Sequence, residues 1–273
     1  YDMGPYLSGV SFTPAPYCYR CPFEKEYPEC DITCAHYIED VINYSTSKNV
    51  AAFIAEPILG EGGIISPPPE YFKVVKKILD NYNILFIADE VQSGFCRTGK
   101  FFGIEHYNIE PDLMTMAKAL ANGYPISACI AKKDIGNSFE PGDHLSTFGG
   151  NPVSAAAAIA TIKELKENNF CKKSKDKGEI IKKKLKEMQE DHSIIGDVRG
   201  KGLMLGMELI QDENKKPAIE DAKKIKEKMQ KKNILIGRGG VSGSVLRIQP
   251  PLSIKAEEIN ELLEKLEECI KLI

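Results

Sequence analysis

The stretch Ile84-Leu85-Phe86-Ile87-Ala88-Asp89-Glu90-Val91-Gln92 decides the fold of this chain. Five apolar residues end abruptly in two acids, which is the pattern of a buried strand that delivers polar side chains to a site. In open α/β sheets, ligands bind beyond the carboxyl ends of the parallel strands. Asp89 and Gln92 follow the apolar run, so we expect both side chains at such a sheet edge.

A second segment has the same form and delivers a lysine. Asp112-Leu113-Met114-Thr115-Met116-Ala117-Lys118 is a short apolar run that leads to Lys118. An acid and a lysine at one sheet edge are what pyridoxal phosphate requires, because the acid keeps the pyridine nitrogen protonated and the lysine forms a Schiff base. A partly desolvated position would help Lys118 to lose its proton. The alternative is an ordinary surface lysine, in a chain with 36 lysines and arginines.

The segments around these two runs predict an α/β fold with a mainly parallel sheet flanked by helices. A strand over residues 49–55 ends before Pro57. After it, a helix crosses to the strand at Ile84, with an apolar face made of Phe72, Val75, Ile78 and Leu79. Another strand is expected over residues 126–131, and the pattern predicts helices over 152–168 and 175–190, the first with Asn151 as its N-cap.

The remainder of the chain predicts a small α+β domain. Its expected elements are a strand, a helix, a strand and a final helix, over residues 202–210, 219–232, 245–248 and 256–270. We therefore divide the chain into a partial cofactor-binding large domain, residues 1–190, and a small C-terminal domain, residues 191–273. Residues 1–35 are rich in Pro, Tyr and Cys and are expected to be irregular and to wrap the surface of the larger domain.

Composition and charge exclude several kinds of partner. The 273 residues are 42% hydrophobic and carry a net charge of −3, so no overall field favours nucleic acid or an anionic membrane. No apolar run reaches the roughly 18 residues that span a bilayer. Eight cysteines in a chain rich in Lys and Glu indicate a reducing compartment, the cytoplasm, rather than a secreted disulfide scaffold.

Four of the cysteines are grouped as C-x2-C-x8-C-x3-C, at Cys18, Cys21, Cys30 and Cys34. The first pair has the spacing of zinc or iron–sulfur ligands. The second pair does not, and the segment is rich in Tyr and Pro. We therefore favour a surface loop with free thiols and predict no metal.

Three further positions suit such a cofactor site. Val91 offers an apolar face to the pyridine ring. Thr147, in Ser146-Thr147-Phe148-Gly149-Gly150-Asn151, lies in a permissive turn before a helix N-terminus, which is a natural anion site, although such turns are common. Arg247 lies in an apolar strand, where its planar fork would bind a carboxylate, either of a substrate or of a structural ion pair.

Taken together, these motifs resemble the class III aminotransferases, the family that includes the ornithine, acetylornithine and 4-aminobutyrate aminotransferases. The resemblance covers essentially the whole chain in the right order. Beyond the two runs quoted above, it rests on segments 56–63, 93–99, 146–152, 200–203 and 246–252.

The resemblance implies a fold-type-I, pyridoxal-phosphate-dependent homodimer with shared active sites. Lys118 would hold the cofactor and move the substrate proton, Asp89 would pair with the ring nitrogen, and Gln92 would pair with the phenolic oxygen. Thr147 would reach the phosphate of the neighbouring subunit's cofactor. Glu61 would pair with Arg247 and release it when a keto acid binds.

The resemblance also leaves alternatives open. Amino-acid racemases and amino-phosphate lyases share this scaffold, and the same motifs serve any chemistry at the α-carbon. The family carries a Ser/Gly-rich phosphate cradle and a ring-stacking aromatic residue upstream of Tyr1 in this numbering, so we expect the N-terminal portion to be missing. A truncated, inactive homologue is the third possibility.

Overall fold

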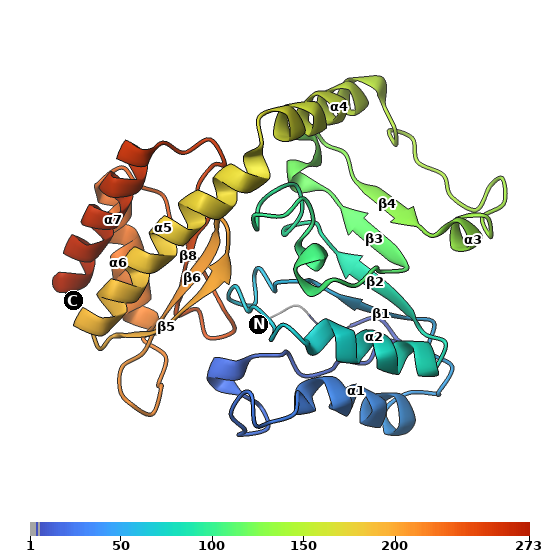
Figure 1. Ribbon diagram of the computed structural model, residues 1–273, viewed down its shortest axis with the longest axis horizontal. Helices are drawn as coiled ribbons and strands as arrows, with labels where there is room; N and C mark the ends of the chain where they lie inside the picture. Colours follow the sequence, from blue (N-terminus) through green and yellow to red (C-terminus); the bar gives the residue numbers. More distant parts are fainter. Residues whose placement is uncertain (1–3, 5) are drawn as a thin grey trace.

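The computed structural model describes residue 4 and residues 6–273, which form two four-stranded sheets (Figure 1). The first sheet has the order β1-β2-β3-β4. Strands β1 (Ala52–Ala55), β2 (Leu85–Asp89) and β3 (Leu113–Met116) are parallel, and β4 (Ala128–Ala131) is antiparallel to β3. The predicted α/β fold with a mainly parallel sheet is therefore confirmed.

Helix α2 (Tyr71–Asn81) makes the predicted crossover between β1 and β2. Its apolar residues recur at helical spacing and are buried on one face, and the ring of Phe72 stacks on Phe86 of β2 with centroids 5.6 Å apart. Helix α1 (Thr33–Tyr44), which the sequence did not predict, packs beside α2. The strand order places β2 in the interior of the first sheet, between β1 and β3.

After β3 the chain forms short elements and then two long helices. The short ones are the 3-10 turn η3 (Lys118–Ala121) and helix α3 (Lys133–Gly136). Helix α4 (Pro152–Glu167) begins as predicted, because the Asn151 side chain accepts a hydrogen bond from the Ser154 amide at 2.9 Å. Two further 3-10 turns are η1 (Cys18–Arg20) and η2 (Gly103–Tyr107).

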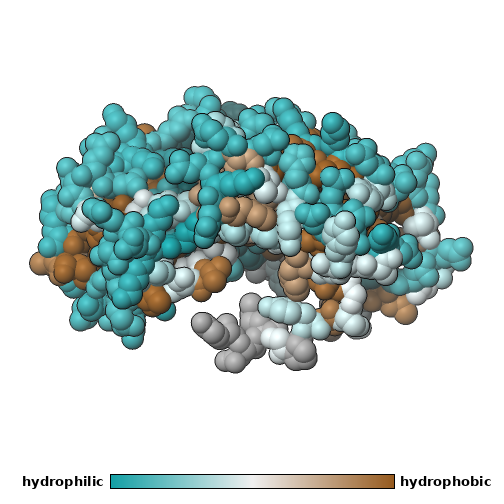
Figure 2. Space-filling model, turned by 90° about the horizontal axis from the view of Figure 1, so that it is seen from below, coloured by the Kyte–Doolittle hydropathy of each residue, from teal (hydrophilic) through white to brown (hydrophobic). Residues whose placement is uncertain are grey.

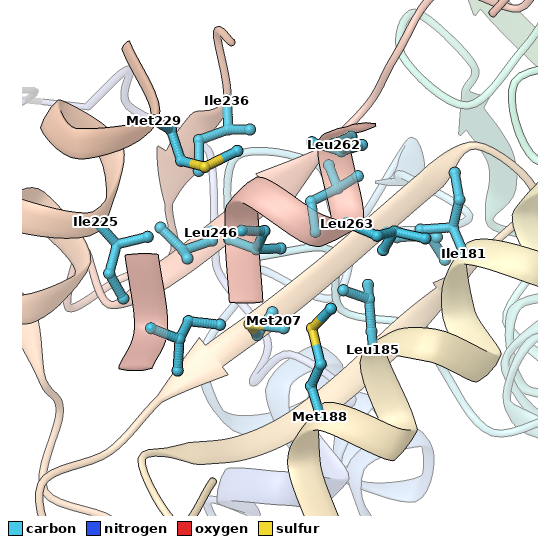
Figure 3. Close-up of a cluster of buried hydrophobic side chains, with 14 of the residues drawn as sticks. Ile181, Leu185, Met188, Met207, Ile225, Met229, Ile236, Leu246, Leu262 and Leu263 are labelled. Atoms are coloured by element: carbon cyan, nitrogen blue, oxygen red, sulfur yellow. The ribbon is translucent and has the colours of Figure 1, made fainter. Parts of the chain in front are cut away.

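Helix α5 (Phe170–Asp191) begins five residues before the predicted start at residue 175 and connects the two sheets (Figure 1). Its Ile181, Leu185 and Met188 belong to the core of the second sheet, together with residues of α6 and α7 (Figure 3). Packing thus joins the second half of α5 to the C-terminal core. The boundary at residue 190 remains a prediction.

The second sheet is antiparallel throughout, with the order β5-β6-β8-β7. Its members β6 (Met204–Leu209) and β8 (Val245–Ile248) and the helices α6 (Ile219–Lys231) and α7 (Ala256–Lys271) lie where the sequence predicted them. The sequence missed β5 (Ile195–Lys201) and β7 (Gly237–Gly239). Both contain glycine and charged residues instead of an apolar run, so neither has the pattern of a buried strand.

The cysteines do not all remain thiols. Cys96 and Cys171 form a disulfide, which departs from the expectation of a chain without disulfides, whereas the four grouped cysteines and two others are free. Within residues 4 and 6–273, no group of three or more His, Cys, Asp or Glu residues is arranged to hold a metal ion. The described part of the N-terminal segment is irregular as expected, apart from the turn η1 and the start of α1 at Thr33. Residues 1–3 and 5 lie outside the described part.

The surface is mostly polar on the face seen in Figure 2, where hydrophobic residues form separate patches between hydrophilic ones. None of the helices in the described part is both long and apolar enough to cross a membrane. The net charge is small, as noted above.

Candidate active site

The first sheet brings Asp89, Gln92 and Lys118 to one edge. Asp89 is the last residue of β2, and its register partner Thr115 lies near the end of the parallel strand β3. Lys118 follows two residues after β3 ends, and its Nζ donates a hydrogen bond to Oε1 of Gln92 at 3.3 Å. Residues 26 positions apart in the sequence are therefore in direct contact, as the sheet-edge argument predicts.

The turn after β2 is fixed from two sides. Oδ1 of Asp89 accepts the backbone N–H of Val91 at 3.0 Å, which orients both residues at the sheet edge. Behind them, Glu90 is fully buried, and its carboxylate accepts hydrogen bonds from the Ser93 hydroxyl and from two backbone amides of η2. Burial raises the pKa of Glu90 and these hydrogen bonds lower it in part, with a net rise. Glu90 therefore anchors the turn and does not face the site.

Lys118 is more accessible than expected. The sequence predicted a partly desolvated amine, whereas the residue is exposed in the structure. The reason is local: β3 ends at Met116, and Lys118 begins a 3-10 turn at the surface with a φ of +43°. A positive φ is uncommon for a residue with a side chain, and such strain is concentrated at functional sites.

Two residues that the sequence analysis missed hold Gln92 in place. Gly60 packs directly on it, because a Cβ at Gly60 would lie 2.3 Å from Oε1 of Gln92. Gln249 accepts a hydrogen bond from Nε2 of Gln92 at 3.3 Å. A signal for Gln249 existed, since residues two apart on an extended segment share a face and Arg247 was already a candidate.

Arg247 and Glu61 form the ion pair that the resemblance implied, between Nη1 and Oε1. The Arg247 side chain is 16% exposed and that of Glu61 is 74% exposed. Nε of Arg247 and Nε2 of Gln249 are buried donors without a hydrogen-bond partner in the described part of the chain. Because buried donors are normally satisfied, these two fit an incoming acceptor such as a carboxylate.

Glu56 is a further acid near the site that the sequence analysis did not select. Its carboxylate accepts the Gly60 amide at 2.9 Å. Burial raises the pKa of Glu56, the Gly60 hydrogen bond lowers it and the charge of Asp89 raises it further, with a net rise. Glu56 therefore supports the Gly60 turn on which Gln92 rests.

The fold does not bring Thr147 into contact with the other predicted site residues. It lies in an exposed segment, and within residues 4 and 6–273 it has no hydrogen bond to Asp89, Gln92, Lys118 or Arg247. Its proposed contact with the cofactor of a neighbouring subunit stays a prediction.

The side chains that do converge fit the ring of pyridoxal phosphate. An acid, an amide and a lysine stand at one sheet edge, with a half-buried valine between the acid and the amide. This is the donor and acceptor set that the ring nitrogen, the phenolic oxygen and the aldehyde carbon of the cofactor require.

Comparison with known proteins identifies the family of the chain. The family model described as aminotransferase class-III matches residues 1–270. The chain is 45% identical over 97% of its length to a leucine/methionine racemase of Thermococcus litoralis, and 46% identical over 83% to an acetylornithine aminotransferase of Caldanaerobacter subterraneus subsp. tengcongensis. It spans only 60% and 55%, respectively, of these relatives.

A solved structure agrees in fold over the whole chain. An amine transaminase from an uncultivated Pseudomonas species, in a form with PLP bound, superposes with a TM-score of 0.92 at 28% identity, covering 100% of this chain and 64% of that one. The predicted fold of fold-type-I transferases is thereby confirmed. The chain belongs to the class-III aminotransferase family.

Proposed function

We propose that this chain is a pyridoxal-phosphate-dependent aminotransferase that moves an amino group from an amino acid or ω-amine to an α-keto acid. The observation that carries the proposal is the contact of Lys118 with Gln92 beside Asp89, at the carboxyl ends of two parallel strands. The family supports the same reaction, since an acetylornithine aminotransferase is 46% identical.

When bound, pyridoxal phosphate supplies a ring that accepts the electron pair of the substrate Cα–H bond. The chain's own residues set the conditions for this step. The Asp89 carboxylate would stabilise a proton on the ring nitrogen, and Gln92, whose amide is held by Gln249, would donate to the phenolic oxygen. Lys118 Nζ would hold the cofactor, and the same amine would carry the proton of the substrate α-carbon.

Arg247 binds the substrate carboxylate in this proposal. Its guanidinium is held by Glu61, whose side chain is exposed and free to swing into solvent. When the Glu61 side chain moves away, the guanidinium of Arg247 can bind the carboxylate. Nε of Arg247 and Nε2 of Gln249, which have no hydrogen-bond partner among the described residues, are then available as donors. Arg247 thus binds a substrate carboxylate when one is present, and Glu61 neutralises the charge of Arg247 when none is bound.

We further propose a homodimer located in the cytoplasm. Exposed apolar side chains close to Thr147 in the sequence support a subunit contact, namely Leu145, Phe148 and Val153. Six free cysteines support a reducing compartment. Sedimentation analysis tests the dimer and cell fractionation tests the compartment.

The test of the reaction is covalent capture followed by a transfer assay. The full chain is incubated with pyridoxal phosphate, reduced with borohydride and digested, and the cofactor is expected on the peptide that contains Lys118. Lys118→Ala should abolish both the label and transfer of a ¹⁵N-amino group to a keto acid. Lys133→Ala, an exposed lysine on α3, should retain both. Unlabelled Lys118 in the intact chain would contradict the proposal.

A racemase is the second candidate, because the leucine/methionine racemase is 45% identical to this chain. The same assay separates the two functions. A racemase exchanges the α-proton of one amino acid with deuterium from solvent and inverts its configuration without any keto acid, whereas a transaminase needs the keto acid for turnover. Inversion without a keto acid, and no ¹⁵N transfer, would assign the racemase.

A further inference from the structure

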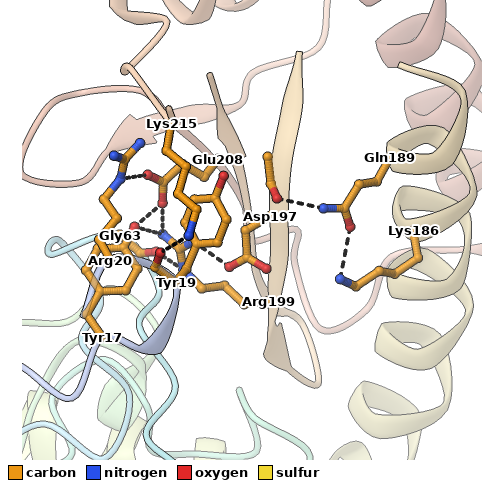
Figure 4. A network of polar contacts seen from close by, with 11 residues as sticks. Tyr17, Tyr19, Arg20, Gly63, Lys186, Gln189, Asp197, Arg199, Glu208 and Lys215 are labelled. Carbon is orange, nitrogen blue, oxygen red and sulfur yellow. Dashed lines mark hydrogen bonds and ion pairs between the residues drawn. The ribbon is translucent and has the colours of Figure 1, made fainter. Parts of the chain in front are cut away.

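A buried arginine of the second sheet holds the loop that carries Glu61. Arg199 lies on β5 and is 9% exposed, and its Nε donates to the carbonyl oxygen of Gly63 at 2.9 Å (Figure 4). On the other side of the loop, the Gly240 amide donates to the Glu61 carbonyl at 3.0 Å. The backbone of the Gly60–Gly63 loop is therefore bound to the second sheet at two points.

The loop and the second sheet are in close backbone contact. Gly63 has a φ of +115°, and a Cβ there would lie 3.1 Å from Cα of Gly240 and 3.2 Å from Nη2 of Arg199. A residue with a side chain would be both strained and obstructed at this position. The close approach of the loop to the second sheet therefore requires glycine at position 63.

Arg199 is itself held by a network that uses every nitrogen of its guanidinium group (Figure 4). Nη1 pairs with Asp197 at 2.8 Å, and Nη2 contacts the Glu208 carboxylate at 2.7 Å and the Tyr17 hydroxyl at 2.9 Å. Its guanidinium carbon also lies 4.8 Å from the centroid of the Tyr17 ring. A planar fork satisfied in this way is rigid, and lysine cannot reproduce it.

The charges of this network balance. Glu208 is buried and also binds Nε of Arg20 at 2.5 Å and the Tyr17 hydroxyl, so two arginines face Glu208 and Asp197. Burial alone would raise the pKa of Glu208, but the Tyr17 hydrogen bond and the charge of Arg199 outweigh it and hold the pKa below its ordinary value. Glu208 therefore stays ionised, and burial keeps Tyr17 protonated by raising its pKa.

We propose that Arg199, fixed by Glu208 and Tyr17, is a positioning residue for the Glu61–Arg247 pair. The contrast within Glu61 supports this. The Gly240 amide binds its carbonyl oxygen, and Arg199 holds the same loop at Gly63, whereas the Glu61 side chain is 74% exposed. Only the side chain of Glu61 then moves when a substrate carboxylate takes Arg247. Arg199 thereby sets how strongly Glu61 competes with that carboxylate, an inference that rests on the proposed function.

The first test needs neither cofactor nor turnover. In Arg199→Lys, loss of a charge-assisted hydrogen bond to the loop should speed amide exchange at Gly240 by about tenfold. The Leu203 amide, which donates to Arg97, should exchange as in the wild type. Tyr17→Phe, a milder change that leaves the guanidinium in place, should show a smaller effect in the same direction. Unchanged exchange at Gly240 in both variants overturns the proposal.

The second test measures competition with Glu61, with glutarate as an unreactive probe for Arg247. Arg199→Lys should tighten glutarate binding severalfold, as should Glu61→Gln, and the two changes together should bind no tighter than Glu61→Gln alone. Lys215→Ala, on the rim of the same network, should bind glutarate as the wild type does. If the effects of Arg199→Lys and Glu61→Gln on glutarate affinity are additive, or if Arg199→Lys binds glutarate as the wild type does, the proposal is overturned. This outcome does not depend on whether the chain transfers amino groups.

Discussion

His106 shows how the surroundings of one side chain create a pH dependence. Its Nε2 lies 3.1 Å from both the carbonyl oxygen and the hydroxyl of Thr98. Burial lowers the pKa of His106 from 6.5 to about 4, with the charges of Lys201 and Lys100 acting in the same direction. The fold therefore holds a neutral imidazole, while the unfolded chain takes up a proton below pH 6.5.

This residue predicts a loss of stability in mild acid. Because the folded-state pKa is depressed, the contribution of His106 is complete above pH 6.5 and is lost as the pH falls toward 4. After discounting for partial exposure, we expect about 1–2 kcal/mol. His106→Gln should remove that part of the pH dependence in urea unfolding. His36→Gln, at an exposed histidine, should keep it, and identical profiles for all three proteins would contradict the assignment.

At the scale of elements, helix α5 depends on one glycine. A Cβ at Gly178 would lie 2.1 Å from the carbonyl oxygen of Gly202, in the turn between β5 and β6. Gly178→Ala must push the helix from the sheet, and we expect a loss of about 2–4 kcal/mol in the free energy of unfolding. Gly136→Ala on α3, where a Cβ meets nothing within 4 Å, is the matched control and should be neutral or slightly stabilising. Equal stability of the two variants in urea would refute this packing.

The same elements show what the sequence could predict. Strands β2 and β3 and helix α4 carry strong local patterns, so the sheet edge with Asp89 and Lys118 was predicted from them. Strand β5 was missed because its Asp197 and Arg199 serve the buried polar network instead of an apolar core. Only tertiary contact reveals that Gln249 reaches Gln92, since no local pattern joins residues 157 positions apart.

For the whole molecule, the disulfide closes a long loop within the first part of the chain. Cys96 lies in the buried loop after β2, and Cys171 lies at the start of α5, 75 positions later, with 4.3 Å between the Cα atoms. Composition predicts free thiols. It does not show that Cys96 and Cys171 pair, because only the fold brings two cysteines 75 positions apart together. The bond closes a loop around β3, β4 and α4. Reduction of the bond therefore removes a covalent link between the loop after β2 and the start of α5.

Reduction should therefore destabilise the protein without altering the fold. For a closed loop of this length, restriction of the unfolded chain predicts about 4 kcal/mol, measured as a lower urea midpoint after treatment with a thiol reductant. A Cys96→Ser, Cys171→Ser double variant should match the reduced protein and no longer respond to reductant. Cys129→Ser, at an exposed free thiol, should retain the full response. If the wild type unfolds identically in both redox states, the bond adds nothing, and packing of the buried Cys96 loop alone connects the first sheet to α5.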